Sequence, residues 1–95
     1  MLTVKLDRQF KKDLKRDQKC GKYTSDDFNR LKTAMDILIE AQELDESYLP
    51  HPLIGEWKGY WECHIKPNWL LIYKRESEVV KFARLGTHQQ LFKKY

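Results

Sequence analysis

Apolar and polar residues alternate at the start of the chain and then change to a helical period. Over residues 1–6, leucine and valine side chains alternate with polar ones, which is the period of a β-strand. Asp7 can begin a helix, and within residues 8–19 Phe10 and Leu14 form a narrow apolar stripe at helical spacing. The first 19 residues therefore predict a strand followed by an amphipathic helix.

A second and more strongly apolar helix is predicted from Ser25 or Asp26 to about Gln42. Its buried stripe contains Phe28, Leu31, Met35, Leu38 and Ile39. Residues 43–56 are acidic and then proline-containing, which predicts a loop. Loops of this length in small domains tend to carry function.

Three strands are expected after this loop, at Lys58–Lys66, Trp69–Arg75 and Val79–Leu85. Only short turns, Lys66-Pro67-Asn68 and Glu76-Ser77-Glu78, separate them, so they form an antiparallel meander. The predicted class is α+β: an N-terminal strand, two helices and a three-stranded meander in a single sheet. We expect one domain over residues 1–95, with the helices on one face of the sheet and the other face open for function.

Charge is divided along the chain rather than spread evenly. The net charge is +4, but residues 1–22 and 57–95 are basic while residues 23–56 are acidic. Six cations share one face of the first predicted helix: Arg8, Lys11, Lys12, Lys15, Arg16 and Lys19. This stripe favours a polyanionic partner, although a solvated surface would show the same pattern.

Targeting signals and metal motifs are not found in the sequence. No apolar run is long enough to span a bilayer, and the N-terminus has no signal-peptide core, so we expect a cytoplasmic protein without a membrane partner. Cys20 and Cys63 are expected to be free thiols, with Cys63 in the core. No HxxxH or CxxC spacing occurs, and neighbouring Cys63 and His64 point to opposite faces of a strand. We therefore expect no metal and no small-molecule cofactor.

The remaining groups suit metal-free cleavage of RNA. This reaction needs a base for the 2′-OH, an acid for the 5′-oxygen and a cation for the phosphorane, and aromatic side chains can stack on bases. The candidates are His51, His64, His88, Arg84, Trp69 and Phe92. Taken one by one, each of these residues is better explained by packing or by a solvated surface than by catalysis, and Trp57 and Trp61 are expected to pack.

The second half of the chain closely resembles the YafQ branch of the RelE superfamily, a group of bacterial type II toxins. The pattern is HPL-x-G-x-WKGY-x-x-x-H-x-x-P-x-W-x-LIY followed by F-x-R-x-GTH-x-x-LF, and it covers about residues 50–92. The matching positions are His51-Pro52-Leu53, Gly55, Trp57-Lys58-Gly59-Tyr60, His64, Pro67, Trp69, Leu71-Ile72-Tyr73, Phe82, Arg84, Gly86-Thr87-His88 and Leu91-Phe92.

The resemblance implies a RelE-like fold and an endoribonuclease that cleaves mRNA in the ribosomal A site without metal. It also implies a cognate antitoxin, in a hetero-oligomer that represses its own operon. The family's functional positions fall on His51, His64, Trp69, Arg84, His88 and Phe92. One position departs from the family: Asn68 stands where an aspartate is common, and an amide cannot take a proton at neutral pH.

The sequence-based mechanism assigns His88 as acid, His64 or His51 as base or phosphate contact, and Arg84 as the phosphorane cation. Asn68 is expected only to position the substrate through hydrogen bonds, while the basic stripe contacts ribosomal RNA or acidic antitoxin side chains. Because of Asn68, the main alternative is a catalytically weak RNA- or ribosome-binding member of the same fold. A DNA-binding regulator is a further alternative, favoured only by the basic helix, which lacks a partner helix in helix-turn-helix spacing.

Overall fold

A computed structural model describes residues 1–92 and contains one five-stranded sheet in the order β1-β5-β4-β3-β2. Its strands are β1 (Thr3–Leu6), β2 (His51–Pro52), β3 (Trp61–Lys66), β4 (Trp69–Arg75) and β5 (Val79–Gly86). β1 runs parallel to β5, and the other neighbouring strands are antiparallel. The α+β class and the meander are confirmed. The sheet has one strand more than expected because β2 forms within the segment predicted to be a loop.

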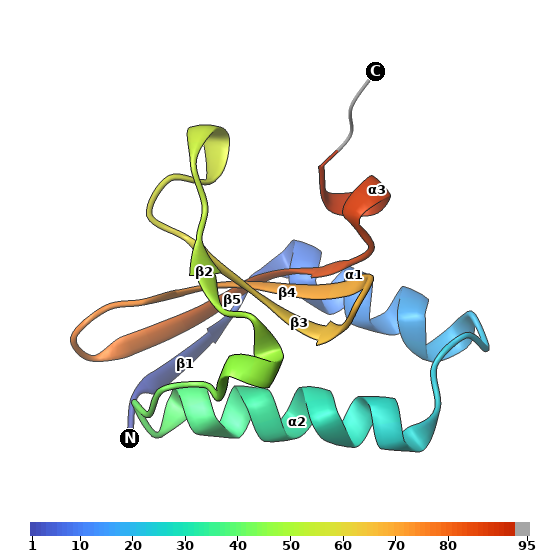
Figure 1. Cartoon of the computed structure of the whole chain (residues 1–95), viewed down its shortest axis with the longest axis horizontal. Helices are drawn as coiled ribbons and strands as arrows, with labels where there is room; N and C mark the ends of the chain where they lie inside the picture. The colour runs from blue at the N-terminus through green and yellow to red at the C-terminus, as the bar shows by residue number, and fades with distance from the viewer. Residues whose placement is uncertain (93–95) are drawn as a thin grey trace.

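The helices separate the two faces of the sheet. α1 (Arg8–Lys19) and α2 (Ser25–Ile39) pack on one face, and α2 begins at a capping box in which Thr24 and Asp27 satisfy each other's backbone N–H groups. Figure 1 shows the turn η2 (Gly55–Trp57) and the short helix α3 (His88–Leu91) rising from the opposite side. A further turn, η1 (Glu46–Tyr48), follows α2. The face expected to be open is therefore flanked by two small elements that form walls around it.

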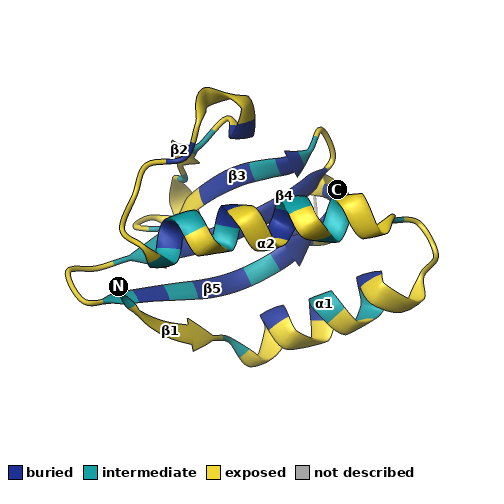
Figure 2. Cartoon of the chain, turned by 90° about the horizontal axis from the view of Figure 1, so that it is seen from below, coloured by how far each residue is buried: buried dark blue, intermediate teal, exposed yellow. Residues whose placement is uncertain are grey.

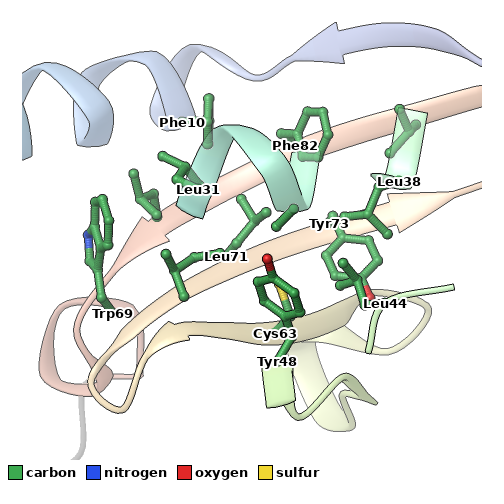
Figure 3. Close-up of a cluster of buried hydrophobic side chains, with 14 residues drawn as sticks. Phe10, Leu31, Leu38, Leu44, Tyr48, Cys63, Trp69, Leu71, Tyr73 and Phe82 are labelled. Carbon is green, nitrogen blue, oxygen red and sulfur yellow. The ribbon is translucent and has the colours of Figure 1, made fainter. Parts of the chain in front are cut away.

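The main core lies between α2, α1 and the sheet. Leu38 of α2, Cys63 of β3, and Leu71 and Phe82 of β4 and β5 are 0% exposed, and Figure 3 shows them converging in this layer. Cys63 is thus a core thiol, as predicted, and Cys20 is exposed; both are free. A second, smaller cluster on the other face contains Leu70, Ile72, Ala83 and Leu91. The meander is consequently buried on both faces at its centre.

β1 is the exposed edge of the sheet, as the strip of exposed residues in Figure 2 shows. Its strand assignment is correct, but its alternation does not bury one side: Val4 and Leu6 are each 41% exposed, and only Leu2 before the strand packs against the core. Trp61, expected to pack, is 42% exposed. Within residues 1–92, no helix is long and apolar enough to cross a membrane.

Candidate functional site

The sheet face opposite α1 and α2 places the predicted polar residues in cross-strand rows. His51 of β2 pairs with Glu62 of β3, Glu62 with Ile72 of β4, and Ile72 with Arg84 of β5. Paired residues share a face, and neighbouring strands are about 4.8 Å apart. Arg84 therefore lies on the histidine-bearing face, about 10 Å from Glu62 at the backbone. We call this surface the open face.

A β-bulge is what turns Arg84 onto the open face. The register between β4 and β5 shifts between Ile72 and Tyr73, so that Tyr73 opposes Phe82 while Ile72 opposes Arg84. In a regular strand, Arg84 would share a face with Phe82, two positions before it, and would point into the core; the bulge at Ala83 reverses this. The bulge makes the arginine available beside the histidines.

The three histidines come together on the open face. The ring centroids of His51 and His64 are 6.0 Å apart, and those of His64 and His88 are 5.8 Å apart. They come from β2, β3 and the first residue of α3. A capping box of Thr87 and Gln90 positions His88, because each side chain accepts a hydrogen bond from the other residue's backbone N–H. The sequence placed these three residues in one site, and the geometry is consistent with this.

Each imidazole donates its Nδ1–H to an oxygen acceptor. His51 Nδ1 donates to the Leu49 carbonyl at 3.0 Å, and His64 Nδ1 donates to the Pro67 carbonyl at 3.3 Å. Leu49 has the left-handed conformation (φ 49°, ψ 51°), an unfavourable backbone geometry for a leucine. Because carbonyl oxygens only accept, both rings keep their proton on Nδ1, and Nε2 is the atom available for chemistry.

Asn68 holds the third imidazole. Its Oδ1 accepts hydrogen bonds from the backbone N of His88 at 2.9 Å and from Nδ1 of the same residue at 2.6 Å. The backbone N–H can only donate, so the Asn68 atom that it meets must be the oxygen. The sequence-based expectation that Asn68 only positions substrate is therefore incomplete: its visible partner is His88, whose Nε2 it leaves free.

Glu62 is a member of this cluster that the sequence analysis missed. Its Oε2 lies 3.1 Å from His51 Nε2 and 3.4 Å from His64 Nε2, and its side chain is only 5% exposed. A signal was present: Glu62 precedes His64 by two positions on a predicted strand, so both side chains share a face. HxxxH and CxxC spacings describe ligands on helices and in loops, and they do not include two ligands at i and i+2 on one strand. The cluster of Glu62, His51 and His64 has the donor atoms of a metal site.

Arg84 is held by a second buried carboxylate, Asp13 of α1. Arg84 donates from Nε to Asp13 Oδ2 at 2.8 Å and from Nη2 to Oδ1 at 3.3 Å. Burial acts to raise the pKa of Asp13, but hydrogen bonds from Arg84, the Leu85 N–H and Gln9 outweigh it and hold this pKa below its usual value. Within residues 1–92, Arg84 Nη1 has no hydrogen-bond partner, so it is available for a phosphate oxygen.

Arg16 differs from the other cations of the basic stripe. β1 ends opposite Phe82, which leaves the edge of β5 without a neighbouring strand beyond that point. There the Leu85 N–H donates to Asp13, and the Leu85 carbonyl accepts from Arg16 Nη2 at 2.8 Å. Arg16 also pairs with Asp13 and Asp17. It therefore closes the sheet edge, whereas the stripe's four lysines are exposed: Lys11, Lys12, Lys15 and Lys19.

The structure overturns the prediction that Trp69 stacks on a base. This side chain is 0% exposed, lies parallel to the Tyr23 ring at 4.1 Å between centroids, and donates from Nε1 to Asp17 at 2.8 Å. Figure 3 shows it at one end of the core. The side chain of a tryptophan at the start of a strand can point to either face of the sheet. Here it points into the main core, where the Asp17 carboxylate accepts the hydrogen bond from its indole N–H.

Phe92 remains available on the open face. It is half-buried against the smaller core cluster and lines a hollow of about 400 Å³ together with Arg84, Trp57 and Leu91. An aromatic ring and an arginine at one hollow can contact a base and its phosphate.

Comparison with known proteins identifies the family. Residues 2–93 match the model of the bacterial toxin of type II toxin–antitoxin systems, YafQ. The chain is 45% identical to the mRNA interferase toxin YafQ of Escherichia coli K12 over 85 residues, 88% of each chain. Its fold is similar to the toxin in the E. coli DinJ–YafQ complex (TM-score 0.85, 41% identity, 97% of this chain and 99% of that one). It also resembles a copper-bound mutant toxin from Helicobacter pylori (TM-score 0.87, 33% identity, 97% and 100%). The chain belongs to the YafQ family of bacterial type II toxins.

Proposed function

We propose that this chain is an endoribonuclease that cleaves mRNA on the ribosome without a metal ion. The observation that carries the proposal is the gathering of three imidazoles, with Arg84, on one sheet face. The E. coli relatives that bear the name mRNA interferase support the reaction class. RNA cleavage needs no redox group and no external nucleophile, because the 2′-OH of the substrate attacks its own phosphate.

In the proposed reaction, His64 Nε2 takes the proton of the 2′-OH while that oxygen forms a bond to phosphorus. Glu62, 3.4 Å away, compensates the positive charge that the ring gains. Arg84 stabilises the dianionic phosphorane through its free Nη1. The P–O5′ bond then breaks, and His88, which enters the reaction as the imidazolium with a proton on each nitrogen, gives its Nε2 proton to the leaving 5′-oxygen and keeps the Nδ1–H that Asn68 accepts. The products are a 2′,3′-cyclic phosphate and a 5′-hydroxyl.

His64 is the better base on geometric grounds. It lies between His51 and His88, and its side chain is 16% exposed, against 47% for His51. A base must hold one position relative to the acid to act on the same phosphate. His51, at the outer end of the series, is assigned a phosphate contact.

Asn68 acts through His88 rather than on the substrate. By accepting the Nδ1–H, it orients the ring with Nε2 toward the open face, as a carboxylate does in other acid–base sites. Being neutral, it stabilises the imidazolium less than an aspartate would. We therefore expect an enzyme with correct geometry and a reduced rate.

Binding on the ribosome is assigned to the exposed lysines of α1. Lys11, Lys12 and Lys15 line a shallow hollow with Leu6 and Arg8. Point charges on a convex helix suit RNA phosphates and acidic side chains without sequence preference. A cognate antitoxin, by analogy with the DinJ–YafQ complex, and a cytoplasmic location are parts of the same proposal.

Cleavage of a defined mRNA on purified 70S ribosomes tests the function directly. The parent should cut in the A site, His88→Ala should lose about 10²–10⁴-fold in rate, and Asn68→Asp should gain rate. Ribosome binding measured by sedimentation, equal for all three chains, is the control. A parent that binds ribosomes but cuts nothing, with Asn68→Asp equally inactive, would instead support a non-catalytic binding protein.

A further inference from the structure

Three lysines on neighbouring strands lie in one row across the sheet. Lys81 of β5 pairs with Lys74 of β4 on one side and with Lys5 of β1 on the other. Paired residues share a face, and Lys81 alternates with Phe82, whose side chain lies in the main core. The three lysines therefore lie on the open face, about 4.8 Å apart from strand to strand at the backbone. We call them the lysine row.

The charge of the lysine row is almost unopposed within residues 1–92. Like charges directly opposite each other on neighbouring strands destabilise a sheet. Asp7 is the one acidic side chain of the described residues that pairs with the row, at 3.6 Å from Lys81 Nζ, and no acidic side chain among them pairs with Lys5 or Lys74. The Asp7 side chain is 43% exposed, so its pair with Lys81 contributes little. An anionic ligand would compensate this charge.

Tyr60 fixes two of the three ammonium groups in position. Its hydroxyl accepts a hydrogen bond from Lys81 Nζ at 3.1 Å, and Lys74 Nζ and Lys81 Nζ lie 5.4 and 5.7 Å from the centre of its ring. The ring itself packs against the smaller core cluster of the open face. The same hydrogen bond raises the pKa of Lys81, which therefore remains charged at neutral pH. The two cations are thus held in place before any ligand binds.

We infer that the lysine row binds the RNA phosphate next to the one that is cleaved. The inference rests on the proposed function, which places the cleaved phosphate at Arg84. Ile72, the partner of Arg84, and Lys74 are two residues apart on β4, which is about 6.7 Å along the strand. Consecutive phosphates of an extended RNA strand have a similar spacing. An RNA with one phosphate at Arg84 and the next at the lysine row runs along β4 and β5.

The role of the lysine row differs from that of the lysines of α1. Its ammonium groups contact phosphate oxygens away from the reacting atoms, so they bind and position the RNA without reading its bases. α1 packs on the other face of the sheet, and its lysines are assigned to the ribosome. Variants of the lysine row should therefore weaken the contact with mRNA and leave binding to ribosomes without mRNA unchanged.

Binding of a short RNA to the full chain tests the site without cleavage. A five-nucleotide RNA methylated at every 2′-oxygen cannot be cut, and NMR of the lysine side chains follows its binding. The double variant Lys74→Gln with Lys81→Gln should bind about tenfold more weakly. Its logarithmic salt slope should fall by about 1.4, the value for two contacts to a single strand. Lys32→Gln on α2 is the control and should bind as the parent does. Equal binding by parent and double variant, or no binding by the parent, would overturn the site.

A neutral linkage in the mRNA identifies the phosphate that the row contacts. Methylphosphonate replaces one phosphate at a time on either side of the cleaved linkage, and cleavage is measured on 70S ribosomes. At one of these two positions the parent should lose about tenfold in kcat/KM, mainly through KM. The double variant should lose nothing more there, because its partner charges are already absent. An equal loss in parent and double variant would mean that other groups contact this phosphate and would overturn the inference.

The two measurements separate this inference from the proposed function. A chain that binds the short RNA through the lysine row but never cleaves mRNA on ribosomes would refute the proposed function and leave the binding site standing. A double variant that cleaves with the kcat/KM of the parent would overturn the lysine row and leave the function standing. Urea denaturation controls for folding: the double variant should be at least as stable as the parent, because it relieves a like-charge pair.

Discussion

Two carboxylates are buried on opposite sides of the site, and their partners differ in kind. Asp13 is surrounded by permanent donors: Arg84, Arg16 and the Leu85 N–H. Glu62 meets only two imidazole nitrogens, which can carry a proton or release it. Asp13 therefore remains an anion that joins α1 to the edge of β5. Glu62 is in an environment whose charge can change during a reaction.

The two carboxylates therefore suit different roles: Asp13 holds Arg84 in place, and Glu62 contacts groups that can exchange a proton. A buried anion with guanidinium partners can hold a catalytic group in place but cannot take part in proton transfer, because arginine does not release its proton. A buried anion with histidine partners can respond to a proton or to a metal ion. Arg84 connects the two regions, since it is held on one side by Asp13 and faces the open face on the other.

Replacing each carboxylate with its amide tests this difference most directly, and the largest effect on stability is expected at Asp13. In Asp13→Asn, the new NH₂ group faces the N–H groups of Arg84 and Arg16, and these two part-buried arginines lose the buried anion that they share. Removal of one partner of a buried pair costs about 3–5 kcal/mol, so the free energy of unfolding should fall by that amount. Urea denaturation followed by circular dichroism measures it. Asp36→Asn is the control: Asp36 pairs with Lys32 on the exposed surface of α2 and should change stability by less than about 0.5 kcal/mol.

Replacing the second carboxylate with its amide, in Glu62→Gln, should change stability little and activity strongly. In Glu62→Gln, the amide NH₂ can donate to a neutral imidazole Nε2, so the free energy of unfolding should change by less than about 1 kcal/mol. Cleavage should fall about 100-fold, because the charge that compensates the protonated base is lost. Rate measurements on ribosomes, beside urea denaturation, decide the point. A large loss of stability with full activity would make Glu62 a second structural anchor and end the distinction.

Acid should lower the free energy of unfolding partly through the Asp13 carboxyl. The pKa of Asp13 is lowered in the folded state, so its contribution to stability is complete above its unfolded value of about 4 and is lost as pH falls through the lower folded value. We expect the free energy of unfolding to decrease below about pH 4 in the parent and to decrease less steeply in Asp13→Asn. Urea titrations between pH 2.5 and 6 measure both slopes. Parallel curves would show that the Asp13 carboxyl is not a linked group.

The sequence predicted the elements, and the grouping of the three histidines, better than it predicted side-chain contacts. Local periodicity is sufficient to predict α1, α2 and the meander. The three histidines were selected as candidates because few side chains exchange protons near neutral pH. Asp13 was missed because a buried acid has no local signature: its burial depends on a partner far along the chain, Arg84. Glu62 had only its i, i+2 spacing from His64 as a local signal, and that spacing does not show that the carboxylate is buried. Trp69 was misassigned for a similar reason, since only the packed structure shows which face of β4 it occupies. The bulge that exposes Arg84 also depends on pairing between strands and not on local preference.

The smallest expected effect concerns two adjacent cations of α1, Lys15 and Arg16. Arg16 belongs to the Asp13 region, whereas Lys15 is exposed and lines the shallow basic hollow. Lys15→Gln should leave the free energy of unfolding unchanged and weaken binding to 70S ribosomes, with the logarithmic salt slope reduced by about 0.7–0.9, the value for one phosphate contact. Sedimentation at several salt concentrations measures the slope, and Lys32→Gln on α2 is the control that should not change it. An unchanged slope for Lys15→Gln would mean that the lysine stripe is only a solvated surface. The contacts of α1 would then lie entirely on the side that supports Arg84.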